Sequence, residues 1–419
     1  MKYLRLALVI SASALQFARA QDEDDNRRAP PTEIPDFSNL DEYIYEPKST
    51  ATIGFRHLSG AKTSFSGQGT IAAPENPGPA TGANLARTYH DGSVSPDSRL
   101  AARTDASGNP IIDPETNGQV FDPVAPDGRT NTWSYTDDRQ TAELPGYVAF
   151  HSYSADVVDT TARSQKALST NGLEIAVTRD MGKLFGSRLA WNLTAGMSVN
   201  DISATRVDTV RANLNRTTDY YSLFGQTPPA APYSAPSSGT QSVLDPAGNP
   251  VLASDGSNQI VSVDTTVLLG NEPAGRSTST VQDTTSVTNR WKVKGAYFTF
   301  RAGPTIWIPI MTRLRASVSF GPALVYSGTD YSVAESFTPD IGADITDNLD
   351  SQTYRLLLGY YADASLQFDL TDHAGLYAGA VYQSAGSYTQ NIDATNAHYT
   401  TKIDLSNQSG LRAGLTVRF

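Results

Sequence analysis

The chain has 419 residues, 39% hydrophobic residues and a formal net charge of −11. The acidic balance argues against a nucleic-acid partner. The sequence contains no cysteine, which excludes disulfides as a source of stability. After the N-terminus no run of about 18 apolar residues follows, which excludes helical membrane spans.

Residues 1–20 have the pattern of a cleaved signal peptide. Lys2 and Arg5 precede a short apolar run, and Ala18-Arg19-Ala20 provides the small-x-small cleavage pattern. The run is shorter than the roughly 20 apolar residues of a spanning helix. We therefore predict an exported protein in which residues 21–50, which are polar and contain proline, form a periplasmic lead-in segment.

Alternation of apolar and polar residues predicts β-strands along the rest of the chain, residues 51–419. The predicted strands are Gly146–Ala155, Gly172–Met181, Arg188–Ile202, Trp291–Ile310, Arg313–Ser327, Gln352–Leu370, Gly375–Gln390 and Ser409–Phe419. A weaker alternation in Ala51–Ile71 would add a hairpin and raise the count from eight to ten. Long loops at about 72–145, 205–287 and 328–352 alternate with short turns.

This pattern predicts an all-β fold, a membrane-spanning antiparallel up-and-down β-barrel with eight strands, or ten as the alternative. The predicted strands exceed the usual 5–6 residues of soluble sheets, and aromatic residues gather towards their ends, as in interfacial girdles. Short periplasmic turns and long extracellular loops are the asymmetry of outer-membrane barrels. A soluble sandwich also alternates, but it has no reason to sort its loops in this way.

A short pattern occurs twice in the long loops. Gly108-Asn109-Pro110, followed by Gln119-Val120, recurs as Gly248-Asn249-Pro250, followed by Gln259-Ile260. Because glycine and Asn-Pro favour turns, the pattern predicts a β-turn that is used twice, each time with short flanking strands.

The end of the chain resembles a known class. In the segment from Arg412 to Phe419, RAGLTVRF, the residues Arg412, Gly414, Val417 and Phe419 occupy the positions of the C-terminal β-signal of bacterial outer-membrane proteins. The segment from Phe368 to Tyr377 is similar to periplasmic turns of the membrane domain of outer membrane protein A. The resemblance implies a Gram-negative outer-membrane location, recognition by the barrel-assembly machinery, and contact with outer-membrane lipid and lipopolysaccharide. It implies no activity.

Charged residues on the predicted inner face are the candidate functional residues. They are Glu174, Arg301, Arg355, Asp363 and Arg412. Side chains just fill the interior of an eight-stranded barrel, so these groups would form a salt-bridged plug, because a lone buried charge is costly. In a wider barrel they would instead line a pore and bias its ion selectivity.

The search for catalytic and metal-binding patterns identifies no site. His57, His90, His151 and His398 are predicted near outer ends, and His373 in a periplasmic turn. None has a hydrolase or protease motif around it, and the acidic loops lack EF-hand spacing. We therefore predict no catalytic residue, no cofactor and no metal. The predicted role is structural or porin-like passive transport. The alternatives are an adhesion module that uses the surface loops, or a hydrolase at the outer rim. The oligomeric state stays open.

Overall fold

The computed structural model describes residues 49–72, 75–166, 169–184, 189–247, 249–253 and 257–419. All of them belong to one compact unit, residues 48–419. The signal peptide and nearly all of the lead-in segment lie outside the described residues. Within the described part of the chain, helices long and apolar enough to span a membrane are absent.

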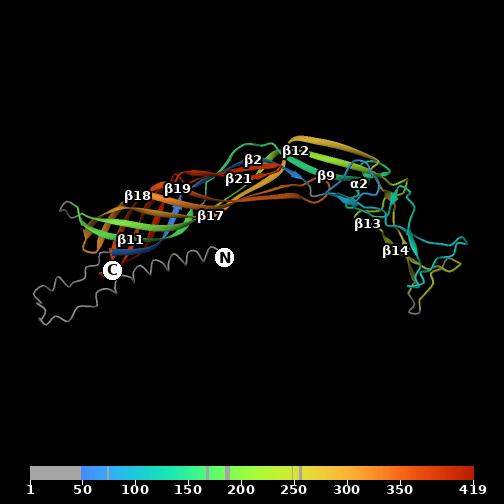
Figure 1. Cartoon of the computed structure of the whole chain (residues 1–419), viewed down its shortest axis with the longest axis horizontal. Helices are drawn as coiled ribbons and strands as arrows, with labels where there is room; N and C mark the ends of the chain where they lie inside the picture. The colour runs from blue at the N-terminus through green and yellow to red at the C-terminus, as the bar shows by residue number, and fades with distance from the viewer. Residues whose placement is uncertain (1–48, 73–74, 167–168, 185–188, 248, 254–256) are drawn as a thin grey trace, which may run out of the picture. The chain divides into compact units, whose positions relative to one another are not determined.

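Eight of the described strands hydrogen-bond to one another in an order that returns to its start, β1-β23-β20-β19-β18-β17-β12-β11-β1, and every pairing is antiparallel. Their bounds are β1 (Ser49–Ser59), β11 (Thr170–Lys183), β12 (Ala190–Ser222), β17 (Gly275–Met311), β18 (Leu314–Phe337), β19 (Ile345–Asp369), β20 (Ala374–Ser384) and β23 (Gln408–Arg418). We call the part of these strands in which all eight pair around the closed order the ring. Figure 1 shows several of its strands side by side near the C-terminus.

Beyond the ring, β12, β17, β18 and β19 continue and stay paired with one another, and β12 gains one further neighbour, β9 (Tyr147–Val157). Hydrogen bonding there runs from β12 to β9, to β2 (Lys62–Ala72), to β22 (Ala397–Asp404) and to β21 (Ser387–Ala394), while β10 (Arg163–Lys166) pairs with β2. The complete sheet therefore contains 13 strands. Neither predicted count, eight or ten, describes this sheet.

Three strand predictions are wrong. Gly375–Gln390 is not one strand, because it divides before Gly386, with a φ of +78°, into β20, which pairs with β19 and β23, and β21, which pairs with β22. The segment Ala51–Ile71 is not a hairpin, because β1 pairs with β11 and β23 whereas β2 pairs with β9, β10 and β22. Gly60, with a φ of +104°, lies where the chain changes neighbours. Gly146–Ala155 is β9, which lies outside the ring and pairs with β12 and β2. Its alternation reflects a face buried in the outer part of the sheet, and alternation alone does not distinguish that face from a barrel interior.

Two predicted loops are too wide. β12 continues to Ser222 and β17 begins at Gly275, so the second connection covers residues 223–274 instead of 205–287. β18 continues to Phe337 and β19 begins at Ile345, which leaves residues 338–344 instead of 328–352. The outward residues of these extensions are mostly Ser, Thr, Asp and Asn. The apolar face that marks a lipid-exposed strand therefore stops before the strand does.

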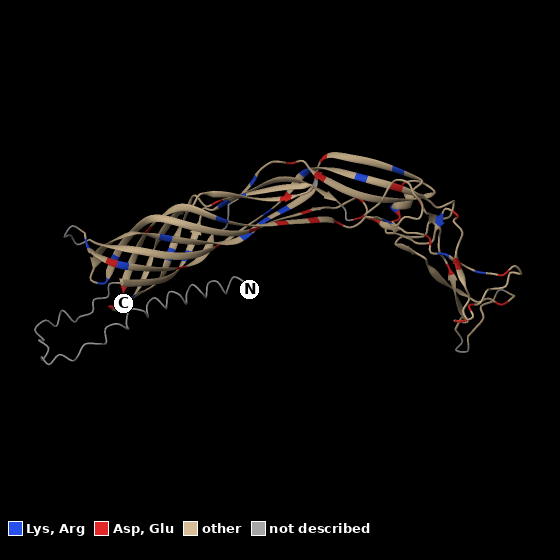
Figure 2. Ribbon diagram, in the orientation of Figure 1, with Lys and Arg blue, Asp and Glu red and all other residues tan. Residues whose placement is uncertain are grey.

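The long connections contain short elements. Residues 75–146 include β3 (Arg87–Tyr89), β4 (Gly92–Val94), β5 (Leu100–Ala102), β6 (Phe121–Pro123), β7 (Arg129–Thr130), β8 (Trp133–Tyr135) and the helix α2 (Arg139–Ala142). Residues 223–274 include β13 (Tyr233–Ala235), β14 (Ser238–Ser242), β15 (Ile260–Asp264) and β16 (Leu269–Gly270). Figure 2 shows charged residues of both signs in the ring strands and in these connections.

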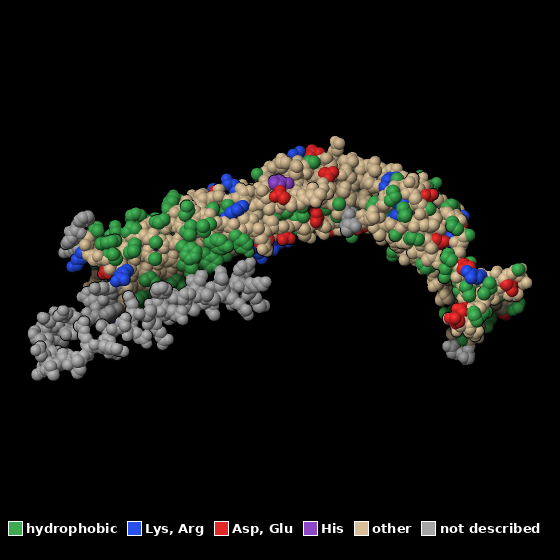
Figure 3. Space-filling model, viewed as in Figure 1, with side chains coloured by type: hydrophobic (Ala, Val, Ile, Leu, Met, Phe, Trp, Pro, Cys, Tyr) green, Lys and Arg blue, Asp and Glu red, His purple; other side chains and the backbone are tan. Residues whose placement is uncertain are grey.

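The outward face of the ring is apolar. Leu358 is 83% exposed, Leu411 67% and Ile53 57%, and hydrophobic side chains cover the visible face of these strands (Figure 3). Such exposure is unfavourable in water but normal against hydrocarbon, where outward apolar residues form the band around a membrane barrel.

Candidate functional site

A cluster of buried ionic side chains crosses the inside of the ring. The carboxylate of Glu174 on β11 faces three guanidinium groups, at 2.8 Å from Arg412 Nε, 3.2 Å from Arg301 Nη2 and 3.6 Å from Arg56 Nε. The four residues come from four different ring strands, β11, β23, β17 and β1. The Glu174 and Arg56 side chains are fully buried. Glu174 therefore links its own strand to three others.

Asp363 and Tyr377 complete the cluster. Asp363 on β19 lies 3.1 Å from Arg301 Nη1 and 2.9 Å from Arg412 Nη1. The Tyr377 hydroxyl on β20 donates a hydrogen bond of 2.7 Å to Glu174 Oε1. With both carboxylates ionised, three arginines face two acids. The cluster then carries one net positive charge.

Two glycines permit this arrangement. Gly54 on β1 lies opposite Gly414 on β23, and a Cβ built on Gly54 would lie 2.0 Å from the Tyr377 hydroxyl. The aromatic ring therefore occupies the space above Gly54, which places its hydroxyl at Glu174. A Cβ on Gly414 would lie 2.1 Å from the Ile53 carbonyl oxygen. Only glycine allows this closeness of strands at the point where the first ring strand meets the last.

The structure brings together four of the five predicted inner-face residues, Glu174, Arg301, Asp363 and Arg412. Arg355 lies elsewhere on β19, opposite Ser327, and is exposed. The prediction assumed that the odd-numbered side chains of β19 lie in the cluster along the whole strand, but only Asp363 does, and Arg355 is too far along the strand to reach it. Sequence reasoning missed Arg56 and Tyr377. Arg56 alternates with Thr52 and Gly54 on β1, but the weak apolar alternation of that strand concealed its inner face.

The interior is filled on both sides of the cluster. At the end of the ring where the chain's C-terminus lies, a cavity of about 40 Å³ is lined mainly by side chains with hydroxyl groups, such as Thr52 and Thr194, and by Gln367. This is room for only a few water molecules. On the other side a hydrophobic core begins, with fully buried Leu58, Tyr297 and Val325 among its members. Side chains, not open space, therefore occupy the described interior.

The residues of the predicted assembly signal lie in or next to β23. Arg412 points into the ionic cluster, and Gly414 makes the close contact with β1. Val417 and Phe419 are outward and about half exposed, at 51% and 52%. This geometry places the segment at the seam between the first and last ring strands. Its recognition by the assembly machinery stays a prediction.

His151, the histidine with most contacts, lies on β9 outside the ring. Its Nδ1 is 2.5 Å from Asp91 Oδ2, and its Nε2 is 2.8 Å from Glu143 Oε2. Burial lowers the pKa of His151, but hydrogen bonds to Asp91 and Glu143 outweigh burial and raise this pKa above its ordinary value. Both ring nitrogens are occupied and the side chain is fully buried, so this imidazole has no nitrogen available to a substrate.

The other described histidines at the outer end have local contacts. His57 lies 2.8 Å from Asn171, His398 lies 2.5 Å from Asp393, and His90 contacts the carbonyl of Ala343. Among the described residues no group of three or more His, Asp or Glu side chains could hold a metal ion.

The two long connections combine into one platform. β8 pairs with β4 and with β13, and β7 pairs with β16. Trp133 and Tyr135 of β8 are buried in its core, together with Phe150 and Tyr221 of the long strands. Because β4, β7 and β8 come from the first connection and β13 and β16 from the second, each connection supports the other.

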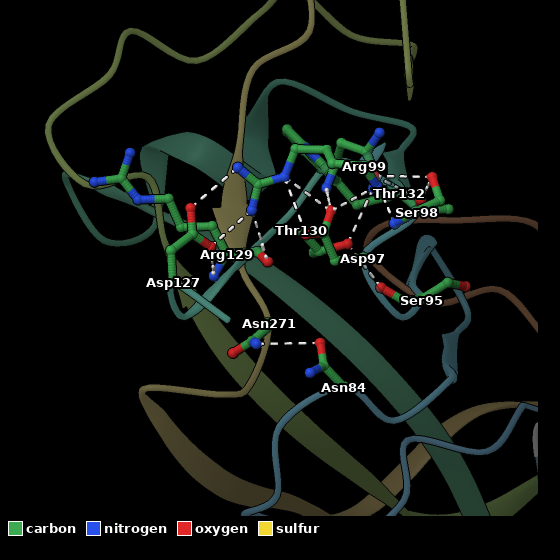
Figure 4. Close-up of polar contacts among 12 residues, drawn as sticks. Asn84, Ser95, Asp97, Ser98, Arg99, Asp127, Arg129, Thr130, Thr132 and Asn271 are labelled. Atoms are coloured by element: carbon green, nitrogen blue, oxygen red, sulfur yellow. Dashed lines mark hydrogen bonds and ion pairs between the residues drawn. The ribbon is translucent and has the colours of Figure 1, made fainter. Parts of the chain in front are cut away.

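A polar network lies at the edge of this platform (Figure 4). Arg99 Nε is 2.9 Å from Asp97, and its Nη2 is 2.7 Å from Asp127. Asn271 donates a hydrogen bond of 3.1 Å to the Asn84 side chain, which joins the second connection to the first. Arg99 therefore holds together the two ends of the segment between Asp97 and Asp127.

Comparison with known proteins gives matches of structure only. No family model matches the chain, and no curated protein sequence matches it. Among solved structures, the outer membrane protease OmpT of Escherichia coli is 10% identical, with 88% of this chain and 96% of that chain covered and a TM-score of 0.27. A Pseudomonas aeruginosa FadL homologue is 10% identical, with 89% of this chain and 90% of that chain covered and a TM-score of 0.16. The P. putida toluene transporter TodX is 7% identical, with 90% of this chain and 91% of that chain covered and a TM-score of 0.17. These superpositions are too loose to transfer any detail.

The chain's own features define its class. The closed pairing order, the apolar outward face and the buried ionic interior are those of a β-sheet protein that spans a membrane with its strands.

Proposed function

We propose that the chain is a sealed outer-membrane β-barrel with a structural role, which anchors its outer connections in the membrane and presents them at the cell surface. In this proposal the ring of eight strands is the membrane-spanning barrel. Outer-membrane lipid and lipopolysaccharide surround it, and the barrel-assembly machinery recognises Arg412, Gly414, Val417 and Phe419.

The observation that carries the proposal is the content of the interior. Glu174 and Asp363 are paired with three arginines inside the ring, and the hydrophobic core continues directly beyond them. A water-filled pore needs a polar, hydrated path along its whole length. The side chains between Arg56 and the outer core leave no such path among the described residues, which favours a plug over passive transport.

The platform supports the presenting role. Its pairings between β7 and β16 and between β8 and β13 join connections that are far apart in sequence. An ordered outer structure on a sealed barrel fits an adhesion or binding module better than a channel. The hydrolase alternative receives no support from His151, because both of its nitrogens already face carboxylates.

Planar-bilayer recording of the purified protein tests the proposal. Heat-modifiable gel mobility first establishes that the sample is folded. The sealed barrel is expected to insert without stepwise current, while a porin under the same conditions shows that steps are detectable. Reproducible conductance steps from the folded protein would contradict the proposal and favour passive transport.

A further inference from the structure

Two projections of the platform share one backbone design. Arm 1 comprises residues 99–127, and arm 2 the described residues 238–247, 249–253 and 257–265. In arm 1 the amide of Arg103 donates to Val120 O (2.8 Å), Ile111 to Arg103 O (2.9 Å) and Val120 to Ile111 O (2.9 Å). Arm 2 repeats this cycle, in which Val243 donates to Gln259 O (2.8 Å), Val251 to Val243 O (2.7 Å) and Gln259 to Val251 O (2.7 Å).

The first turn of each arm is also the same. The amides of Ser107 and Asn109 both donate to Asp105 Oδ1, and those of Ala247 and Asn249 both donate to Asp245 Oδ1. This confirms the predicted turn that is used twice. The second turn is one residue shorter in arm 2, because the bridge Ile112–Gln119 corresponds to Leu252–Asn258. Val120 therefore corresponds to Gln259 and not to Ile260.

Both arms present large apolar side chains to solvent. Leu100 and Phe121 of arm 1 are 61% and 51% exposed, and Leu252 and Ile260 of arm 2 are 61% and 60% exposed. Figure 3 shows hydrophobic side chains on these outermost connections. Unlike the apolar face of the ring, these residues lie outside the membrane in the proposed arrangement. Each arm therefore offers two large exposed apolar side chains to a partner.

The fixed charges of the arms are predominantly acidic. Arg99 and Arg103 of arm 1 are engaged by Asp97, Asp127 and Asp122, and the sequence of arm 2 contains no lysine or arginine. Asp113 and Glu115 of arm 1 and Asp264 of arm 2 have no cation partner among the described residues. Arms that carry both such carboxylates and exposed apolar side chains complement a partner that is both basic and apolar.

The arms also have free strand edges. β5 pairs only with β6, and β14 only with β15, among the described strands. Unpaired backbone groups at a sheet edge accept an added strand. An added strand places alternate side chains on opposite faces. On β15, Val261 and Val263 lie on one face and Asp264 lies on the other, so apolar side chains of the added strand can contact the valines while its basic side chains reach Asp264.

We propose that the two arms bind a cationic polypeptide segment in extended conformation, in which basic and apolar residues alternate, by adding it to their free strand edges. A second copy of this chain is a poorer partner, because it would bring its own carboxylates against these. The inference rests on the proposed presenting role of the outer connections and names the partner of that surface.

The test uses the full chain in nanodiscs of zwitterionic lipid and a labelled peptide of alternating lysine and valine, followed by fluorescence anisotropy. Saturable binding is expected, and it should weaken as salt rises from about 20 to about 300 mM. A peptide with glutamate in place of lysine should not bind. The variant Leu100→Ser/Phe121→Ser/Leu252→Ser/Ile260→Ser should bind the lysine peptide about tenfold more weakly or worse, because the apolar contacts are lost.

The matched control is Leu85→Ser/Leu144→Ser, which removes exposed leucines outside the arms and is expected to bind as the wild type does. Unchanged heat-modifiable mobility shows that each variant is folded. Absence of binding, equal binding of the glutamate peptide, equal binding by the arm variant or concentration-dependent self-association in place of binding would overturn the inference. If the protein does not conduct and does not bind the peptide, only the inference about the arms is overturned. If it conducts and still binds the peptide, only the proposal of a sealed barrel is overturned.

Discussion

Replacement of Glu174 by glutamine is the perturbation to which the proposed plug should be most sensitive. The change keeps the shape of the side chain but removes the charge that faces Arg56, Arg301 and Arg412. Arg301 and Arg412 keep Asp363 as a partner. Arg56 keeps only the neutral Ser198 and Gln383, so a buried guanidinium loses its counter-charge.

The expected loss follows from the charge balance. The cluster changes from one to two net positive charges, and removal of one member of a buried ion pair typically costs about 3–5 kcal/mol. With a urea dependence of about 2 kcal/mol per M, a loss of 4 kcal/mol moves the unfolding midpoint down by about 2 M. The double variant Glu174→Gln/Arg56→Met restores the original net charge and should recover part of this loss.

Urea unfolding in detergent, followed by heat-modifiable mobility and tryptophan fluorescence, measures the effect. Glu115→Gln removes a carboxylate from an exposed position in arm 1 and should leave the midpoint unchanged. If Glu174→Gln unfolds at the wild-type urea concentration, the ionic cluster does not stabilise the barrel and the reasoning fails.

Three further changes test other parts of the molecule. Because the pKa of His151 is raised in the folded protein, its contribution to stability is complete below its unfolded value of about 6.5 and is lost as pH rises through the folded value. Limited proteolysis of the outer connections should therefore accelerate with increasing pH, and a pH-independent difference between wild type and His151→Gln would refute this. Gly414→Val should lower the folded fraction in gels, because its side chain would meet the Ile53 carbonyl. Gly118→Ala should not, because a Cβ there would make only an ordinary van der Waals contact of 3.5 Å with Thr116 Oγ1. Arg99→Met should speed proteolytic cleavage of residues 99–127 several-fold without a change in the urea midpoint. Unchanged cleavage would show that the ion pairs of Arg99 with Asp97 and Asp127 (Figure 4) do not order arm 1.

The sequence predicted the strands that face lipid, because a lipid-exposed face demands outward apolar residues such as Leu358 and Leu411 at every second position. The sequence did not predict the strand segments whose outward side chains face water. The extensions of β12 and β17 carry polar residues outward, and in sequence they cannot be distinguished from loop. It also failed at β1 and β9, since a strand's parity shows which residues share a face but not which neighbours the strand has.

The same distinction explains the candidate site. Four of the cluster residues could be predicted because each is a charged residue on the polar face of a clearly alternating strand. They are Glu174, Arg301, Asp363 and Arg412. Arg56 could not, because the apolar Leu58 shares its face and the polar His57 lies on the opposite face, which leaves β1 with little contrast between its faces. Tyr377 could not, because its role depends on Gly54, which lies far away in sequence and becomes its neighbour only when the ring closes.

The central claim is that the barrel interior is sealed, and thiol accessibility on intact cells tests it most directly. The chain has no cysteine of its own, so single Ser→Cys variants report one position each. Ser327 is fully buried beyond the ionic cluster, whereas Ser107 is exposed in arm 1. A membrane-impermeant maleimide should label Ser107→Cys on cells and leave Ser327→Cys unlabelled until the protein is boiled. Labelling of Ser327→Cys in the folded protein at the rate of Ser107→Cys would contradict the sealed barrel.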